Sequence, residues 1–405
     1  MLKGKRIVVG VTGGIAAYKS AELLREFIRR EADVRVIMTK NAAEFITPLT
    51  LQTLSGNPVF CDMFSLIKES EIAHIALAEY GDMMLIAPAT ANVIGKIASG
   101  IADDLLTTTI MATKAPVLLC PAMNTNMYTN VIVRENIEKL TARGYLFVEP
   151  AHGELACKSE GMGRLAEVSE IVEEVESILT VKDLKGERIL VTAGPTREPF
   201  DPVRYITNYS SGKMGYALAR IAERRGAEVT LISGPSSLPV PRGVKFIPIS
   251  SAVEMRDAVM ENLEASTVII KAAAVADYRP VVCSNAKIKK QDGPLAISLT
   301  RNPDIISEIG KKKGERILVG FAMESENLIE NAKAKMLEKN MDLIIANDLT
   351  EEGAGFQTDT NIVKILSRNE EIEELPLMNK AEVANRILDR VKEIITRKGF
   401  KGSRG

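Results

Sequence analysis

Apolar runs typical of buried strands recur along this chain of 405 residues, and each is followed by a segment with helical spacing. The runs cover 7–11, 34–39, 83–87 and 117–120 in the first half, and 189–192, 228–233, 268–272, 316–321 and 343–347 in the second. Strands that alternate with helices form parallel sheets with helices on both faces. The chain is therefore predicted to be α/β, with doubly wound, Rossmann-like sheets of three layers.

A charged segment that contains Gly186, residues 181–188, separates the two series of strands. The chain is also longer than one hydrophobic core usually accommodates. We therefore expect two doubly wound domains, residues 1–182 and 183–405.

The composition argues against several classes of function. A formal net charge of −1 gives no electrostatic basis for binding nucleic acid or an anionic membrane surface. No apolar run approaches the roughly 18 residues of a spanning helix, so we expect a cytoplasmic protein with no membrane partner. The four cysteines include no C-x-x-C pair, which indicates neither a disulfide framework nor a zinc site. His74 and His152 are the only imidazoles that could act as bases near neutral pH.

Residues suited to ligand binding follow the strands of the first half. In a doubly wound sheet the ligand lies beyond the carboxyl ends of the strands. Gly13-Gly14, Thr39 and the segment 88–92 all fall at such ends, and together they predict a cofactor site. The turn VTGGIAAYK alone is equally compatible with a structural role, because glycine is common in tight turns.

The segment 189–225 opens the second half with a predicted strand, a long loop and a helix. Glycines and serines in the loop offer backbone N–H groups ahead of a helix N-terminus, which favours a phosphate-bearing ligand. No G-x-G-x-x-G follows Thr192, and Gly212-Lys213-Met214 lacks the Ser or Thr that follows the lysine of a Walker loop. The loop is therefore neither of the common phosphate-binding motifs.

Three segments of the first half resemble the flavin-containing cysteine decarboxylases. They are the loop APATANVIGKIASGIADDLL at 87–106, the substrate clamp PAMNTNM at 121–127 and the active-site flap at 155–165. The resemblance implies bound FMN. It also implies that the flavin is contacted by Gly13, Gly14, Ile15, Ala16, Thr39, Pro88, Ala89, Thr90 and Asn92. Tyr128 stands where the clamp often has Trp, and Lys158-Ser159 where the flap usually has Gly-Asp.

The same resemblance implies catalytic roles for His74 as base, Asn124 at the substrate carboxylate and Cys157 as proton donor. The chemistry requires such groups, because loss of carbon dioxide from a cysteine amide would leave an unstabilised carbanion. A flavin can oxidise the thiol to a thioaldehyde that accepts the electrons. A base and an acid are then needed for the proton transfers. Taken alone, His74 could be a structural helix histidine; His152 has no matching role and is treated as structural.

The second half resembles phosphopantothenate-cysteine ligase, which forms the second half of a bifunctional coenzyme A biosynthesis family. The matching motifs are DPVRYITNYSSGKMG, KAAAVADYRP, NPDII, GFAMES and ANDLTEEGAGFQTD, in the family's order between about 185 and 370. The resemblance implies that CTP activates phosphopantothenate as an acyl-cytidylate, from which the amine of cysteine displaces CMP. The product, phosphopantothenoylcysteine, would be the substrate of the first half.

Residues of the ligase site are assigned by the same resemblance. Asn208 and Lys287 are expected to be catalytic, and Asp277 to bind Mg²⁺ or Mn²⁺ directly or through water. The expected nucleotide contacts are Lys271, Ala272, Ala273, Asp277, Pro303, Asp304, Ile305, Ile306, Phe321, Lys335 and Lys339. The family also implies self-association, with decarboxylase trimers and ligase dimers combined in a dodecamer.

Alternatives remain open from the residues alone. Lys287, Lys289 and Lys290 could form a solvated charged face, and Lys335 with Lys339 at i, i+4 could belong to a salt-bridged helix surface. One rival function is a nicotinamide-dependent oxidoreductase, which the missing G-x-G-x-x-G disfavours. The other is a non-catalytic binding protein with the decarboxylase fold, which the joint presence of the three catalytic candidates disfavours.

Overall fold

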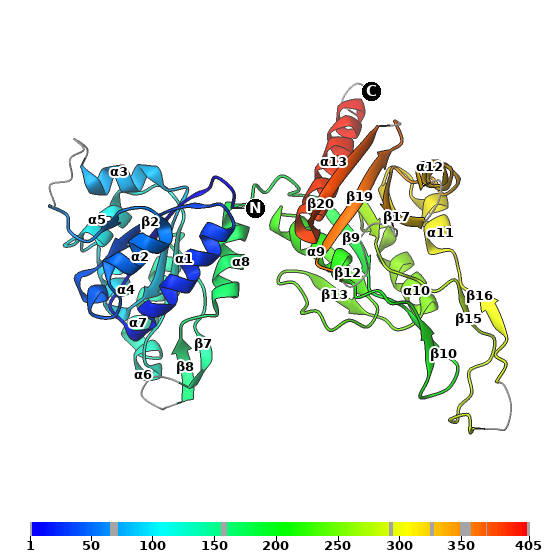
Figure 1. The fold of residues 1–405 in the computed structure, drawn as a ribbon, viewed down its shortest axis with the longest axis horizontal. Coiled ribbons are helices and arrows are strands. Elements are labelled where there is room, and N and C mark those ends of the chain that lie inside the picture. Colours follow the sequence, from blue (N-terminus) through cyan, green and yellow to red (C-terminus); the bar gives the residue numbers. More distant parts are fainter. Residues whose placement is uncertain are drawn as a thin grey trace. The chain divides into compact units, whose positions relative to one another are not determined.

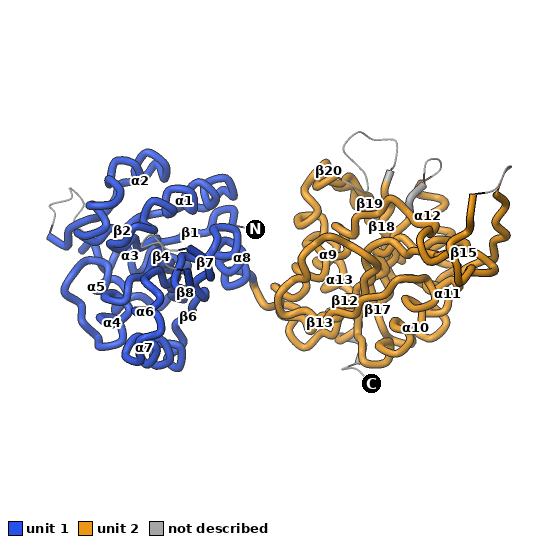
Figure 2. The backbone as a smooth tube through the Cα atoms, turned by 90° about the horizontal axis from the view of Figure 1, so that it is seen from below, with its two compact units in different colours: residues 1–180 blue, residues 181–405 orange. Residues whose placement is uncertain are grey.

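The computed structural model describes residues 2–64, 72–154, 160–290, 295–324, 328–348, 358–369 and 371–402. It divides into two compact units, residues 1–180 and 181–405 (Figures 1 and 2). The predicted proton donor Cys157 and the departure at Lys158-Ser159 lie outside the described residues. Within the described residues, no helix combines the length and apolar character needed to cross a membrane.

Unit 1 is built on a six-stranded sheet in the order β3-β2-β1-β4-β5-β6, in which every neighbouring pair is parallel. Its strands are β1 (Arg6–Val11), β2 (Asp33–Met38), β3 (Val59–Phe60), β4 (Met83–Ala89), β5 (Val117–Pro121) and β6 (Leu146–Phe147). Its helices are α1 (Lys19–Arg29), α2 (Pro48–Ser55), α3 (Ala73–Tyr80), α4 (Ala91–Ser99), α5 (Leu105–Ala112), α6 (Thr125–Tyr128), α7 (Val131–Thr141) and α8 (Val168–Leu179), with 3₁₀ turns at η1 (Ile15–Tyr18) and η2 (Lys40–Glu44). A separate hairpin pairs β7 (Ala151–Glu154) with β8 (Glu160–Arg164).

Each face of this sheet carries its own hydrophobic core. Side chains alternate along a strand, so Ile7 and Val9 of β1 pack on one side with α1, α2 and α8, while Val8 packs on the other with α3, α4, α5 and α7. Apolar side chains on both faces explain why the strands are uninterrupted apolar runs. This arrangement confirms the predicted three-layer fold.

Unit 2 has an eight-stranded sheet in the order β13-β12-β9-β14-β17-β18-β19-β20. Its strands are β9 (Arg188–Ala193), β12 (Glu228–Ser233), β13 (Lys245–Pro248), β14 (Val268–Lys271), β17 (Ile317–Glu324), β18 (Leu343–Asp348), β19 (Thr360–Ser367) and β20 (Ile372–Asn379). Its helices are α9 (Lys213–Arg224), α10 (Ala252–Leu263), α11 (Ile305–Lys312), α12 (Leu328–Glu338) and α13 (Lys380–Gly402). Two small pairs, β10 (Arg197–Pro199) with β11 (Tyr205–Thr207) and β15 (Tyr278–Pro280) with β16 (Leu299–Arg301), extend from its body (Figure 1).

The second sheet is also covered on both faces. Val268 and Ile270 of β14 face α9 and α13, whereas Ile269 faces α10, α11 and α12. The strands from β13 to β18 are parallel, and β19 and β20 are antiparallel additions with a register shift between Asn361 and Val363. These two strands were not predicted from the sequence, because Lys364 interrupts the apolar residues of β19 and β20 buries few of its side chains.

Candidate functional site

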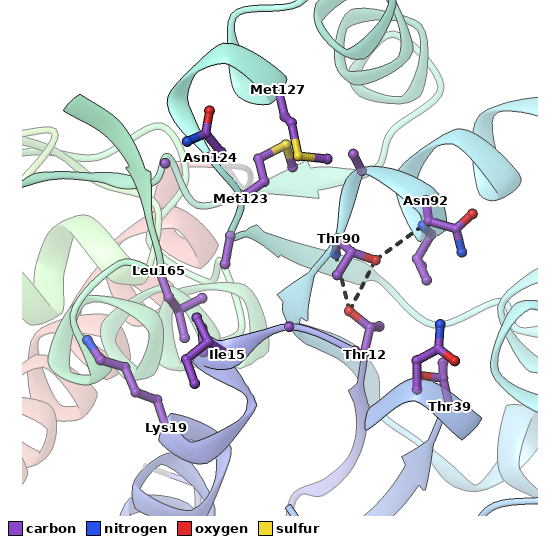
Figure 3. A pocket seen from close by; sticks show the side chains of 18 of the residues that line it. Thr12, Ile15, Lys19, Thr39, Thr90, Asn92, Met123, Asn124, Met127 and Leu165 are labelled. Carbon is purple, nitrogen blue, oxygen red and sulfur yellow. Dashed lines mark hydrogen bonds between the residues drawn. The ribbon is translucent and has the colours of Figure 1, made fainter. Parts of the chain in front are cut away.

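Unit 1 contains a cavity of about 1140 Å³ where the strand order reverses between β1 and β4. This is the crevice in which doubly wound sheets bind ligands, and the volume is ample for a cofactor-sized molecule. Seven of the residues predicted to contact the flavin line this cavity: Gly13, Gly14, Ile15, Ala16, Thr39, Thr90 and Asn92. Figure 3 shows Thr39, Thr90 and Asn92 on one side of the cavity, with Met123, Asn124 and Met127 on another. Thr12, which was not predicted, lies beside Thr90.

A hydrogen-bonded link joins the ends of β1 and β4 at the floor of this cavity. The buried hydroxyl of Thr12 donates to the carbonyl oxygen of Pro88 at 2.7 Å and accepts from the backbone N–H of Thr90 at 3.2 Å (Figure 3). Thr90 in turn caps α4, since its hydroxyl accepts from the N–H of Val93. Pro88 and Ala89 are therefore buried in the strand end behind the cavity wall and do not line it.

Close backbone packing shapes the cavity at two glycines. A Cβ on Gly13 would lie 2.4 Å from the Cβ of Asn41, so only glycine allows the turn after β1 to approach η2. Gly163 has φ of +140°, and a Cβ there would lie 2.2 Å from the carbonyl oxygen of Met123. Its own carbonyl accepts from the N–H of Met123 at 2.9 Å. The β8 strand thus fixes the segment that carries Asn124.

Asn124 lines the cavity and caps α6, with its Oδ1 accepting from the N–H of Asn126 at 2.8 Å. Because Oδ1 is the acceptor in this cap, the amide nitrogen is the group that could donate to a substrate carboxylate. Several cavity residues were not predicted, including Lys19, Met123, Met127, Arg164 and Leu165. The two methionines fall inside the clamp motif, and Arg164 and Leu165 at the end of the flap, so the quoted motifs could have indicated them.

His74 lies in the first turn of α3, which packs against α5, and it is half-buried. It is not among the residues that line the cavity of its own chain. Sequence position alone could not reveal this separation, because the resemblance assigns a role to His74 without placing it relative to the cavity.

The residues around the first cavity fit a flavin. Ile15, Met123, Met127 and Leu165 offer apolar surface for a flat ring system, while the threonine hydroxyls and the turn after β1 offer polar contacts. A Cβ built on Gly14 would meet only Thr90 Cγ2, at 3.7 Å, so the backbone there is open to a ligand.

Unit 2 contains a cavity of about 440 Å³ between the end of β14 and helices α11 and α12. Nine of the predicted nucleotide contacts line it: Lys271, Asp277, Pro303, Asp304, Ile305, Ile306, Phe321, Lys335 and Lys339. Ala272 and Ala273 do not line it; they continue β14, with N–H groups that donate to the carbonyl and hydroxyl of Thr192. The cavity is also lined by three residues that were not predicted: Tyr278, Arg301 and Asn302. Asn302 is the first residue of the NPDII motif, and Arg301 directly precedes it.

Opposite charges are paired within this second cavity. The ammonium of Lys339 lies 2.7 Å from Asp304 Oδ2, and Asp304 Oδ1 accepts from the N–H of Ser307 as the cap of α11. Burial lowers the pKa of Lys271 to about 8; the charge of Asp304 opposes this change, and the charge of Lys335 adds to it. Lys271 is therefore a cation that can lose its proton within the ordinary working range of pH.

Nucleotide binding should consequently weaken as pH rises. The folded pKa of Lys271 is depressed, so its ammonium is present below about pH 8 and is lost above it. If this cavity binds a nucleoside triphosphate as predicted, losing one charge-assisted contact should weaken the binding of CTP, used as the probe, by about tenfold between pH 7 and 9.5. Titration calorimetry across this range measures the effect, and Lys271→Arg, which keeps its charge, is the control. An equal decline in Lys271→Arg would show that another group is responsible.

Asn208 and Lys287 do not line the second cavity. Asn208 is half-buried in the loop before α9, and its Nδ2 donates to the carbonyl oxygen of Ala274 at 3.0 Å, across the strand-order reversal between β9 and β14. Ala274 lies between Lys271 and Asp277 in the chain, so this bond holds Asn208 beside the cavity-forming loop.

The loop of Lys287 is anchored by a buried carboxylate. Asp201 Oδ2 accepts from the N–H of Ile288 at 3.2 Å and pairs with Arg204, whose guanidinium also donates to the carbonyl of Ile288 at 2.9 Å. The bond to Arg204 holds the pKa of Asp201 well below its usual range. Lys287 is exposed on this anchored loop. Among the described residues, no group of three or more His, Cys, Asp or Glu side chains could hold a metal ion.

Family models match both halves of the chain. One described as "Flavoprotein" matches residues 1–180, and one described as "DNA/pantothenate metabolism flavoprotein C-terminal domain" matches residues 184–395. The fold and the two cavities therefore belong to a two-part flavoprotein of pantothenate metabolism. Over 403 residues, 98% of this chain and 99% of the relative, it is 48% identical to the Coenzyme A biosynthesis bifunctional protein CoaBC of Bacillus subtilis (strain 168). The chain belongs to this family of bifunctional coenzyme A biosynthesis proteins, which confirms the resemblance found in the sequence.

Solved structures resemble each half separately. The C-terminal domain of a Coenzyme A biosynthesis bifunctional protein CoaBC is 42% identical and covers 53% of this chain and 99% of its own, with a TM-score of 0.47. A phosphopantothenoylcysteine (PPC) decarboxylase mutant complexed with pantothenoylaminoethenethiol is 32% identical and covers 43% of this chain and 97% of its own, with a TM-score of 0.39.

Proposed function

We propose that unit 2 joins phosphopantothenate to cysteine with CTP, and that unit 1 decarboxylates the product to phosphopantetheine with FMN. The observation that carries this proposal is the presence in one chain of two cavities, one lined by seven of the predicted flavin contacts and the other by nine of the predicted nucleotide contacts. The family to which the chain belongs supports both activities. The two reactions are consecutive, since the product of the ligase is the substrate of the decarboxylase.

In the ligase reaction, a carboxylate oxygen of phosphopantothenate attacks the α-phosphorus of CTP and releases pyrophosphate. Lys271 and Lys335 offset the charge of the triphosphate, and Asp277 is the proposed ligand of Mg²⁺ or Mn²⁺. The amine of cysteine then attacks the acyl carbon, loses a proton and displaces CMP. Asn208 has one amide hydrogen engaged by Ala274 and a second available to the acyl or phosphate oxygen.

In the decarboxylase reaction, Asn124 donates its amide N–H to the substrate carboxylate and holds it in the cavity. When FMN is bound, it supplies the two-electron chemistry that makes the thiol carbon an electron sink. His74 accepts the thiol proton, and Cys157 remains the proposed donor of the last proton.

Self-association is part of this proposal, because His74 does not line the cavity of its own chain. To act there as a base, His74 must either come from a second copy of the chain or move. Ile72 and Ile75 beside His74 are exposed, as are Ile15 and Tyr18 at the cavity. Contact between copies would cover such apolar side chains. Trimers of the decarboxylase part, dimers of the ligase part and a dodecamer of both are the expected assemblies.

Incubation of the protein with phosphopantothenate, cysteine, CTP and Mg²⁺ tests both activities at once. Mass analysis should detect phosphopantothenoylcysteine first and phosphopantetheine later. A colourless protein that forms neither product would refute the proposal, whereas flavin absorbance without product would favour the non-catalytic rival.

His74→Asn should abolish decarboxylation and leave ligation intact. Loss of a general base typically lowers a rate by about 10² to 10⁴ fold. Asparagine is similar in size and still polar, so flavin absorbance should persist. Product analysis with added phosphopantothenoylcysteine measures the first effect, and CMP release measures ligation.

His152→Asn is the matched control for this variant, because the imidazole of His152 is exposed and lies 3.9 Å from Glu160 with no proposed role. It should retain both activities. Loss of ligation in His74→Asn would contradict the assignment of the two activities to separate units.

A further inference from the structure

We propose that Lys19 and Arg164 form a phosphate subsite in the first cavity and hold there the phosphate of phosphopantothenoylcysteine. This inference rests on the proposed function of unit 1 and extends it to the end of the substrate that is remote from the reacting thiol. Both side chains line the cavity, and neither belongs to the predicted flavin contacts.

Lys19 is a buried cation with donors to spare. It begins α1, and the hydroxyl of the next residue, Ser20, donates to the carbonyl oxygen of Ala87 at 2.8 Å, so the first turn of α1 is held against the end of β4. The side chain of Lys19 is only 10% exposed. Among the described residues, none accepts a hydrogen bond from its ammonium; Glu167 Oε2 lies 3.9 Å away, beyond hydrogen-bond reach. Such a buried ammonium favours an anionic ligand, because unsatisfied charged donors are costly.

Arg164 supplies a second cation beside the first. It ends β8, opposite Ala151 of β7, and its Nη2 lies 3.0 Å from Glu167 Oε1. Glu167 is the N-cap residue of α8, which packs against α1. One carboxylate therefore faces two cations, and the group of three keeps a net positive charge. A phosphate monoester is largely a dianion near neutral pH, so it complements this charge.

The position of Lys19 assigns the phosphate to the substrate. Figure 3 shows Lys19 on the same side of the cavity as Leu165, away from the predicted flavin contacts Thr39 and Asn92. Asn124, which is proposed to hold the substrate carboxylate, lies near the top of this view, and Lys19 lies near the bottom. Carboxylate and phosphate are at opposite ends of phosphopantothenoylcysteine. A substrate bound at Asn124 can therefore extend toward Lys19.

Two other lysines that line the cavity are less suited to this role. The ammonium of Lys96 lies 2.7 Å from Asp103 Oδ1 and 3.4 Å from Asp104 Oδ2, so two carboxylates already offset its charge. Lys40 is exposed in η2, directly after the predicted flavin contact Thr39. Lys19 and Arg164 are thus the cavity cations that are best placed for the substrate phosphate.

Binding measurements on the full-length, FMN-loaded protein test the inference. Titration calorimetry would compare phosphopantetheine with pantetheine, which has the same arm without the phosphate. The unaltered protein should bind phosphopantetheine about a hundredfold more tightly, and Lys19→Met should lower this ratio about tenfold without changing the affinity for pantetheine. Lys19→Arg, which keeps the charge, should retain most of the ratio. Lys139→Met removes an exposed lysine of α7 outside the cavity and should leave the ratio unchanged.

Glu167→Gln should act in the opposite direction. Its carboxylate lies beside both cations and would repel a bound phosphate, so the neutral amide should raise the ratio about two- to fivefold. A lower ratio in this variant would contradict the placement of the phosphate between the two cations.

The affinity ratio separates phosphate binding from a structural role of Lys19. If Lys19→Met weakened both ligands by the same factor, or if the unaltered protein bound both equally, the inference would be wrong. Titration of the apoprotein with FMN covers the other source of a phosphate: loss of FMN affinity in Lys19→Met with an unchanged ratio would assign Lys19 to the flavin and overturn the proposal. Carbon dioxide release is scored separately. Phosphate-selective binding without carbon dioxide release supports the inference and refutes the proposed decarboxylase activity, whereas equal turnover of phosphopantothenoylcysteine and pantothenoylcysteine refutes only the inference.

Discussion

Asn208→Asp should form the acyl-cytidylate and fail to convert it to the cysteine amide. Asn208 donates to the carbonyl of Ala274 at 3.0 Å, and its second amide hydrogen is the donor that the proposed mechanism uses. An ionised carboxylate can donate to neither partner and repels developing negative charge. Removing one such donor typically costs about 2.7–4 kcal/mol of transition-state stabilisation, so turnover should fall about 10² to 10³ fold.

Pyrophosphate release without matching CMP release is the expected signature, with trapped acyl-cytidylate visible by mass. CTP should still bind, because the residues that line the nucleotide cavity are unchanged. Asn262→Asp is a matched control: its Nδ2 also donates to a backbone carbonyl, that of Ala258 at 2.8 Å, but on α10 outside the cavity. If the Asn208→Asp variant ligates at the normal rate, Asn208 is only a structural turn residue and has no catalytic role.

Gly163→Ala should disable the first unit almost completely. The new Cβ would lie 2.2 Å from the carbonyl oxygen of Met123, which is backbone and cannot rotate away. A positive φ and a forced shift of the packed segment together cost about 2–5 kcal/mol. The shift displaces Asn124, the next residue, so decarboxylation should fall more than a hundredfold while ligation continues.

Thermal unfolding followed by flavin fluorescence measures the loss of stability, and carbon dioxide release measures the loss of activity. Gly144→Ala separates the two causes, because Gly144 has φ of +89° but no atom lies within 4 Å of its added Cβ. It should show only the conformational cost of about 1–2 kcal/mol, with activity retained. Equal behaviour of the two variants would mean that the contact with Met123 is unimportant.

The parallel sheets could be predicted because strands covered on both faces must be apolar throughout. The predicted run 7–11 is thus β1 without its first residue, and 228–233 coincides with β12. The antiparallel strands escaped prediction because Lys364 divides the apolar residues of β19 into two pairs, and because β20 buries few side chains and Pro376 interrupts its apolar residues.

Residues carried by motifs at strand ends could be placed in cavities from the sequence, because topology brings those ends together. Thr39, Thr90 and Asp277 are examples. Contacts between distant segments could not be predicted, since they depend on tertiary packing. The pairing of Lys339 with Asp304, 35 residues apart, and the anchoring of Ile288 by Asp201 are of this kind.

The antiparallel pair β19–β20 also determines how the second sheet ends. Two residues of β20, Pro376 and Leu377, oppose one residue of β19 at the register shift, and proline has no N–H to offer a further strand. Glu373 and Glu374 lie on the same edge strand and pair with Arg390 and Lys364. Such an edge resists extension by a strand from another molecule. The proposed ligase dimers should therefore use other surfaces, and unit 2 is protected on this side against edge-to-edge aggregation.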